Sequence, residues 1–351
     1  MTNLNNNRVN TALILGATGS FGSALTHTMA AAGWHVRAVT RKPAPERSNP
    51  SELETDASGC VEWVQGDLDE PTSLAAAANK VDVIVHSVNV PYPKWDPVMI
   101  DYTQSIIDLA ISNSAHLIFV GNVYNAGIPS NGVISHNTPD APINDKGDVR
   151  ATLERMIRDA SQQGLRSTIM RFGDFFGPGI ETINWFNEFT KSVAKNKLTV
   201  PGPVDVAHTW AYLPDACKAT EQVARERINN MSTSAHLVLP FRGHVFSFAE
   251  LQQQLERITG NRIKTANLPW PLFKALGLFM PLMKDVVKMR YLWQHDIQMD
   301  NTALKSLLRH EPAHTTLAAA LCATIPALSN CTAEQTDLNG NPRPVENVPG
   351  V

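Results

Sequence analysis

Two groups of polar side chains have the types and the spacing that acid–base chemistry requires. Lys146, Arg150 and Glu154 recur every fourth residue, so they share one face of a predicted helix. A lysine there can exchange protons near neutral pH if burial and a neighbouring cation lower its pKa, and Arg150 could supply that cation. Tyr124 and Asn122 follow a predicted strand, where a hydroxyl can donate a proton and an amide can hold a substrate carbonyl.

Each group also has a plainer interpretation. A lysine, an arginine and a glutamate at this spacing often form only a solvated helix face. Tyr124 could pack against a substrate without exchanging a proton. The sequence therefore leaves the proton donor open between Lys146 and Tyr124.

A glycine-rich turn near the N-terminus predicts a phosphate site. A strand at 12–15 runs into Gly16-Ala17-Thr18-Gly19-Ser20-Phe21-Gly22, and a helical pattern follows at 23–32. This order lets backbone amides approach a pyrophosphate at a helix N-terminus. The alternative is an ordinary strand-to-helix turn, which seldom needs three glycines in seven residues.

The ends of the next two predicted strands bear on the nucleotide. The strand at 34–40 ends in Arg41 and Lys42 with no acidic residue, which favours NADP(H) over NAD(H), although such cations can also just solvate a loop. After the strand at 61–65, Asp67 could accept the adenine amino group while Leu68 covers the ring. Asp67 could equally cap the following helix.

Further apolar strands alternate with helices along the chain. Because they are rich in Val and Ile, they predict a parallel sheet covered on both faces, with its ligand crevice at the carboxyl ends of the strands. We expect an α/β, Rossmann-like doubly wound parallel sheet with a smaller C-terminal substrate-binding region. The expected division is 8–178 for the NADP-binding domain with 206–240 returning to it, 179–205 and 241–328 for the substrate-binding region, and 329–351 for a disordered tail.

Composition restricts the function classes. With 351 residues, 43% hydrophobic and a net charge of −3, the chain predicts a globular protein that does not bind nucleic acid. Scattered cysteines, a polar N-terminus and a proline-broken apolar stretch at 268–283 predict a cytoplasmic protein without a membrane partner. Asp69, Glu70, His208 and Asp215 lack the spacing of metal ligands, so no metal is expected. A homodimer is left open.

Several motifs together resemble the short-chain dehydrogenase/reductase superfamily in its extended or atypical branch. They are the 16–22 turn, Gly66-Asp67-Leu68, the segment from Arg171 to Gly179 (RFGDFFGPG) and Tyr212-Leu213-Pro214-Asp215-Ala216. The resemblance covers roughly 11–281 and implies a nicotinamide cofactor. The expected cofactor contacts are Gly16, Thr18, Gly19, Ser20, Phe21, Gly22, Arg41, Lys42, Asp67, Leu68, Ser87, Val88, Lys146 and Phe172.

The catalytic positions depart from that family. Asn122 stands where the family has a serine, and Lys146 and Arg150 stand where it has tyrosine and lysine. The segment Lys146-x-x-Val149-Arg150-x-x-x-Glu154 resembles one in isoflavone-reductase-like and phenylcoumaran-benzylic-ether-reductase-like enzymes. That resemblance implies that Lys146 is the acid–base residue beside the nicotinamide.

The sequence predicts an NADPH-dependent reductase of an apolar or aromatic small molecule, such as a carbonyl, an enone or a benzylic ether. One alternative is a non-catalytic NADP-binding sensor like the NmrA-type regulators. The other is an epimerase or dehydratase that retains its cofactor and uses Tyr124. The expected substrate contacts are mostly aromatic, which favours an apolar ligand: Val90, Tyr92, Trp95, Phe175, Phe176, Trp185, His208 and Trp210.

Overall fold

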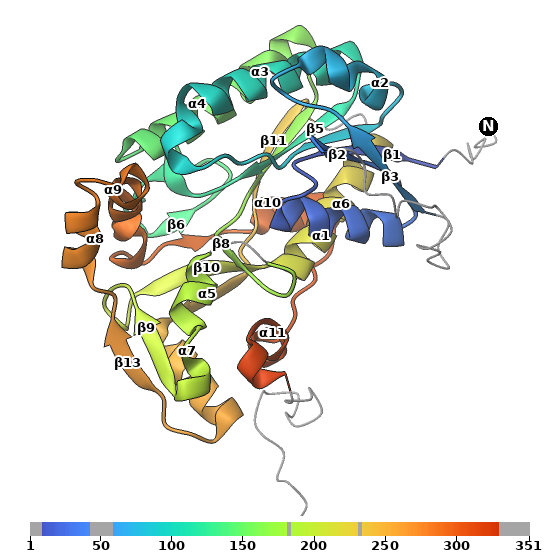
Figure 1. Cartoon of the computed structure of the whole chain (residues 1–351). Helices are drawn as coiled ribbons and strands as arrows, with labels where there is room; N and C mark the ends of the chain where they lie inside the picture. Colours follow the sequence, from blue (N-terminus) through green and yellow to red (C-terminus); the bar gives the residue numbers. More distant parts are fainter. Residues whose placement is uncertain (1–8, 43–58, 181–183, 231–233, 330–351) are drawn as a thin grey trace, which may run out of the picture.

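A seven-stranded sheet, parallel throughout, forms the centre of the molecule (Figure 1). The computed structural model describes residues 9–42, 59–180, 184–230 and 234–329. The strands are β1 (Thr11–Leu15), β2 (His35–Thr40), β3 (Cys60–Gln65), β4 (Val83–His86), β5 (His116–Gly121), β7 (Ser167–Arg171) and β11 (His236–Pro240). Their order is β11-β7-β5-β4-β1-β2-β3, so the direction of winding reverses between β1 and β4. This confirms the predicted doubly wound α/β sheet, a fold in which ligands are expected at the carboxyl ends of the strands beside that reversal.

Alternate side chains of β1 serve two different cores. Leu13 and Leu15 pack with the helices α3 (Trp95–Ser112) and α4 (Asp145–Asp159) on one face, and Ala12 and Ile14 pack with α1 (Ser20–Ala31) and α6 (Leu213–Asn229) on the other (Figure 1). Because both faces are covered, β1 is buried at every position, which explains its continuous apolar sequence.

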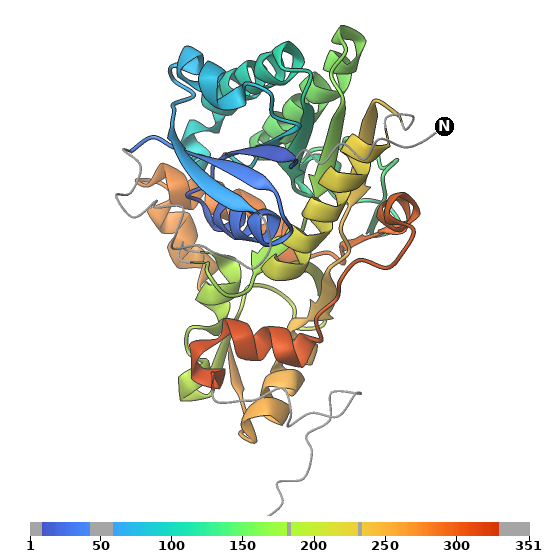
Figure 2. The same cartoon turned by 90° about the vertical axis from the view of Figure 1, so that its right-hand side faces the viewer.

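Smaller sheets and short helices extend the molecule below the central sheet (Figures 1 and 2). The strands of these sheets are β8 (Asp174–Phe176), β10 (Ala207–Tyr212) and β12 (His244–Ser247), the pair β9 (Lys197–Val200) and β13 (Lys264–Asn267), and the pair β6 (Val133–Ile134) and β14 (Gln298–Met299). The remaining α-helices are α2 (Ala75–Ala78), α5 (Trp185–Thr190), α7 (Phe248–Thr259), α8 (Trp270–Leu276), α9 (Pro281–Lys288), α10 (Thr302–Leu308) and α11 (Leu317–Thr324).

The central layers and the region below them exchange more segments of the chain than the sequence suggested. Within 206–240, β11 and α6 belong to the central layers, whereas β10 pairs with β8 and β12 in the three-stranded sheet. Helix α10, expected in the substrate-binding region, packs against α6 and β11 instead. The predicted tail lies outside the described residues from position 330 on.

His86 ends β4 at the carboxyl edge of the sheet and is completely buried. Its Nε2 lies 3.0 Å from Thr103 Oγ1, and its ring lies 5.0 Å from the Phe119 ring. Burial, and then the charge of Arg150, lower the pKa of His86 to about 3. In the unfolded chain His86 has the ordinary histidine pKa of 6.5, so between these two pKa values only the unfolded state binds the proton.

We therefore expect the free energy of unfolding to fall as the pH drops below about 6.5, because protonation stabilises only the unfolded chain. The variant His86→Gln has no imidazole to protonate. Between pH 7 and pH 5 its free energy of unfolding should therefore fall by about 2 kcal/mol less than that of the unaltered chain. Urea unfolding at both pH values measures the difference, with His295→Gln as the exposed control. An unchanged pH dependence in His86→Gln would contradict the assignment.

Candidate active site

The glycine turn brings β1, α1 and the end of β4 into close contact. Gly16 has a φ of +88°, and a Cβ there would lie 2.8 Å from the Ser87 carbonyl carbon. A Cβ on Gly22 would clash with the Gly16 carbonyl oxygen. Both positions therefore need glycine, for conformation at Gly16 and for close approach at Gly22.

The start of α1 suits a phosphate. Gly19 is the N-cap residue and makes no side-chain cap, and no acidic residue occupies the first turn. Helix amides and the positive end of the helix dipole attract an anion at such an end. The turn thus fits the pyrophosphate of a dinucleotide, as the resemblance implied.

The other expected cofactor residues differ in how much of each side chain is free to contact a cofactor. Arg41 and Lys42 are exposed after β2. Asp67 accepts a hydrogen bond from the Asp69 backbone N–H at 3.0 Å, so one of its oxygens holds its own turn. Phe172 is 1% exposed and packs against Phe21, which leaves almost none of its surface for a cofactor. A cofactor contact by Phe172 therefore has no support in the structure.

Lys146 is buried in the first turn of α4 and neutralised by carboxylates. Its Nζ donates to the Tyr92 carbonyl oxygen at 2.8 Å and lies 3.2 Å from Asp285 Oδ2 on α9. Asp145 Oδ2 is 3.6 Å away. Lys146 and Asp285 are each 8% exposed in their side chains. The cationic neighbour that the sequence suggested for Lys146 is thus offset by two anions.

Arg150 and Glu154 share the helix face with Lys146 but bind different groups. The Arg150 guanidinium lies 4.6 Å from the centroid of the Trp95 ring and donates to the Val120 carbonyl oxygen at 3.3 Å. Glu154 pairs with Arg171 at 2.6 Å. The predicted common face is present, yet its three charged groups do not converge on one point.

Tyr124 lies just beyond β5, and its hydroxyl meets a second phenol. The hydroxyl oxygens of Tyr124 and Tyr92 are 2.9 Å apart, and the Trp95 ring stacks on Tyr124 at 6.2 Å. Asn122 Oδ1 accepts a hydrogen bond from the Tyr124 backbone N–H at 3.0 Å, so this oxygen shapes the turn. Tyr92 is partly exposed and Tyr124 is buried, which makes Tyr92 the outer member of the pair.

Both phenols hold their protons at neutral pH. Burial raises the pKa of Tyr92 to about 12, although its hydrogen bond to Tyr124 opposes the rise. Burial also raises the pKa of Tyr124 well above its usual value, and the charges of Tyr92 and Asp174 add to it. A protonated hydroxyl can donate to a developing alkoxide, so the pair is suited to giving a proton.

Asp174 and His208 form a second polar pair near the phenols. His208 Nε2 lies 2.9 Å from Asp174 Oδ2, and His208 Nδ1 lies 3.1 Å from the Leu292 carbonyl oxygen. The His208 ring thus lies between a carboxylate and a backbone carbonyl, two hydrogen-bond acceptors. Nearby, the buried Tyr291 hydroxyl has no hydrogen-bond partner among the described residues.

Sequence reasoning did not assign site roles to Asp174, Asp285 and Tyr291. Asp174 lies within the motif that ends at Gly179, whose recognisable feature is its glycine and proline pattern. Asp285 and Tyr291 lie far along the chain from Lys146 and Tyr92, and their positions follow only from how α9 and the next turn fold back. No spacing rule could have found them.

The expected substrate aromatics separate into several places. Phe176 and Trp210 are at most 1% exposed and belong to the core below the sheet. Phe175 packs against Phe21 on the cofactor turn. Trp185 is partly buried against Trp293. Tyr92 belongs to the phenol pair, and the Trp95 ring contacts both of its members. His208 binds Asp174, the acidic neighbour of the pair. The Val90 carbonyl oxygen accepts a hydrogen bond from Trp95 Nε1–H.

The connection between α8 and α9 leaves apolar side chains in solvent. Leu278 is 80% exposed and Phe279 is 86% exposed. This segment precedes Asp285, so an apolar surface adjoins the helix that neutralises Lys146. None of the helices in the described parts of the chain is both long and apolar enough to span a bilayer.

Comparisons with known proteins match most of the chain. The family model "NAD dependent epimerase/dehydratase family" matches residues 12–233. Among curated proteins, the uncharacterized protein y4nG of Sinorhizobium fredii is 26% identical over 179 residues, which are 49% of this chain and 42% of that protein. The chain thus aligns with less than half of that relative.

Solved structures share the fold at low identity. UDP-glucuronic acid 4-epimerase from Bacillus cereus, in complex with NAD, has a TM-score of 0.69 at 18% identity, covering 91% of this chain and 96% of that one. UDP-glucose 4-epimerase from Brucella ovis has the same score and identity, covering 91% and 98%. The dTDP-glucose 4,6-dehydratase DesIV from Streptomyces venezuelae has a TM-score of 0.68 at 16% identity, covering 91% and 97%.

The ion pair between Lys146 and Asp285 yields a stability prediction. Asp285→Asn removes the nearer carboxylate and leaves the buried Lys146 charge with the half-exposed Asp145 at 3.6 Å, so we expect the free energy of unfolding to fall by about 3 kcal/mol. The double variant Lys146→Met/Asp285→Leu removes both charges and regains most of the loss. Urea unfolding measures all three proteins.

An exposed pair provides the matched control. Lys191 and Glu188 lie 2.6 Å apart on the surface, so Glu188→Gln is expected to cost about 1 kcal/mol or less. Equal, small effects of Asp285→Asn and Glu188→Gln would show that the buried pair does not hold α9 in place.

Proposed function

Since the chain belongs to the NAD-dependent epimerase/dehydratase family, we propose that it is a nicotinamide-dependent enzyme acting on a hydroxyl- or carbonyl-bearing carbon of a small molecule. The observation that carries this proposal is the hydroxyl pair of Tyr124 and Tyr92, 2.9 Å apart at the carboxyl end of β5. A bound nicotinamide would supply hydride exchange at the substrate carbon. The chain itself supplies binding, orientation and the proton.

Tyr124 is the proposed proton donor. Its hydroxyl is protonated at neutral pH because burial raises its pKa, and Tyr92 offers a hydrogen-bonded route toward solvent. Lys146 is the weaker candidate because its ammonium is held between Asp285 and the Tyr92 carbonyl oxygen. The family's standard tyrosine position therefore has a structural role here, and the proton comes from a different element.

The cofactor would be held by the glycine turn and by the end of β2. Gly16, Gly19 and Gly22 shape the turn at the start of α1, and no side-chain cap blocks it. Arg41 is exposed after β2, and the sequence at the end of that strand, Thr40-Arg41-Lys42, contains no acidic residue, which favours a 2′-phosphate and hence NADP(H). The solved relatives named above are described with NAD, so cofactor choice is the point on which this chain would differ from them.

Cofactor choice can be measured by titration. We expect NADPH to bind about tenfold more tightly than NADH, because the Arg41 guanidinium can pair with the 2′-phosphate. Arg41→Ala should abolish the difference, whereas Lys218→Ala, an exposed lysine on α6, should leave it unchanged. Tighter NADH binding, or a preference that survives Arg41→Ala, would overturn the NADP assignment.

The reaction type that family membership favours is an epimerase or dehydratase cycle in which the cofactor returns to its starting state. The solved relatives act on nucleotide sugars according to their names. A net NADPH-dependent reductase of an apolar carbonyl, enone or benzylic ether is the second candidate. It is favoured by the exposed Leu278 and Phe279 on the connection leading into α9 and by the aromatic rings around Tyr124. The missing tyrosine–lysine pair would also suit a non-catalytic sensor.

Tyr124→Phe tests the proton donor in either reaction. We expect kcat to fall by about 10²–10⁴-fold with little change in KM, because only the hydroxyl is lost. Tyr102→Phe is the control, since the Tyr102 hydroxyl binds Asp69 Oδ1 at 2.6 Å in an exposed position. The substrates to screen are UDP-glucose, UDP-glucuronic acid and dTDP-glucose for cofactor-neutral conversion, and aryl ketones, enones and benzylic ethers for NADPH oxidation.

The double variant Lys146→Met/Asp285→Leu separates the two candidate donors without leaving a buried charge. Retained turnover in this variant together with lost turnover in Tyr124→Phe supports the proposal. The opposite pattern would assign the proton to Lys146. Tight NADPH binding with no turnover on any of these substrates would favour the sensor.

A further inference from the structure

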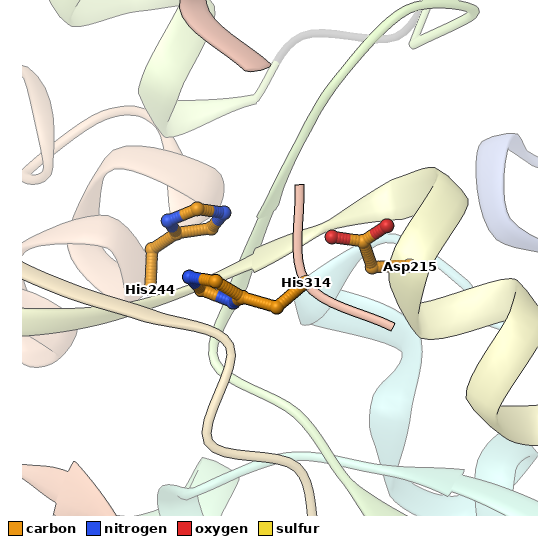
Figure 3. Close-up of side chains that lie close together, drawn as sticks. All are labelled: Asp215, His244 and His314. Carbon is orange, nitrogen blue, oxygen red and sulfur yellow. The ribbon is translucent and has the colours of Figure 1, made fainter. Parts of the chain in front are cut away.

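Three potential metal ligands meet below the central sheet. They come from segments of the chain far from Tyr92 and Tyr124. Asp215 comes from the first turn of α6, His244 from the first position of β12, and His314 from the connection between α10 and α11. One ligand atom from each lies within 4.8 Å of the other two (Figure 3). The two imidazole rings are 4.4 Å apart between centroids.

His244 is the residue whose burial needs an explanation. It is 5% exposed, and its Nε2 has no hydrogen-bond partner among the described residues. An unpaired buried ring nitrogen costs free energy, so such a group usually has a partner of some kind. Among the described His, Cys, Asp and Glu side chains, Asp215 and His314 are the ones grouped with His244.

Two hydrogen bonds from Thr315 fix the position of the Asp215 carboxylate. Thr315 donates to it twice, from the backbone N–H at 2.6 Å to Oδ2 and from the hydroxyl at 2.9 Å to Oδ1. Each carboxylate oxygen keeps a further lone pair, and hydrogen bonds of this kind orient a carboxylate ligand. Thr315 also follows His314 directly, so one segment supplies both a ligand and the group that positions another.

We propose that Asp215, His244 and His314 bind one divalent transition-metal ion of the Zn²⁺ type. Two imidazoles and one carboxylate suit such an ion, whereas Ca²⁺ and Mg²⁺ prefer oxygen ligands alone. Tetrahedral Zn²⁺ needs its ligand atoms about 3.3–3.5 Å apart, so the cluster must close slightly. His314 is exposed on a connection between helices, so it is the ligand that can move.

The bound ion would fasten the C-terminal part of the described chain. His314 lies on the segment that leads into α11, while Asp215 and His244 belong to α6 and β12. The ion would therefore tie α11 to the main body of the molecule. Its fourth position would be filled by water, because the cluster is open on the His314 side.

The test uses tag-free full-length protein, stripped with a chelator and titrated with Zn²⁺ and with Co²⁺ as a visible probe. We expect one ion per chain and a rise in Tm with Zn²⁺. The exposed position of His314 makes His314→Ala the cleanest variant, and it should weaken binding about tenfold or more and remove the Tm rise. His310→Ala, on the same connection, is the matched control and should bind as the unaltered chain does.

A second variant and readout guard against an effect on folding. His244→Asn should also lose the Co²⁺ absorption, and circular dichroism reports whether it remains folded. Zn²⁺ should slow proteolytic cleavage near α11 in the unaltered chain but not in His314→Ala. No stoichiometric binding to the unaltered chain, or equal affinity in His314→Ala and His310→Ala, would overturn the proposal.

Discussion

The ion pair between Lys146 and Asp285 is the interaction on which the arrangement of the candidate site depends. A lysine in the first turn of α4 lies at the carboxyl edge of the sheet, where it is buried and cannot be left unpaired. The nearer partner carboxylate comes from α9, so this buried ion pair forms only when α9 folds back against α4; Asp145 on α4 itself lies 3.6 Å away and adds a second anion. Leu278 and Phe279 lie on the connection that leads into α9 and are exposed to solvent.

Because Lys146 is held by Asp285 and the Tyr92 carbonyl oxygen, we assign the acid–base role to Tyr124. Its hydroxyl is desolvated by aromatic neighbours and paired with Tyr92, and burial raises both pKa values. Desolvated phenols keep their protons at neutral pH, so each hydroxyl is in the form that can donate a hydrogen bond, and then the proton, to a strongly basic developing alkoxide. Arg150 lowers the pKa of Tyr92 through its charge, which opposes the burial and assists the reverse step.

The sequence was enough to predict the fold and the cofactor turn, because both depend on local patterns. Apolar strands buried on both faces are continuous in sequence, and Gly16 and Gly22 are required by close backbone contacts. The site was predictable only in part. Tyr124 and Tyr92 were singled out, but their hydroxyl contact could not be, and neither could the role of Asp285, because it depends on how distant segments pack. The same limit applies to Asp215, whose neighbours His244 and His314 lie far away in the sequence.

A structure of the chain with a bound nicotinamide dinucleotide would test the central claim most directly. The account predicts that the Tyr124 or Tyr92 hydroxyl is the ionisable group nearest the nicotinamide ring, with Lys146 still paired to Asp285. A structure in which Lys146 has left Asp285 and its Nζ points at the ring, with both phenols remote, would contradict the account.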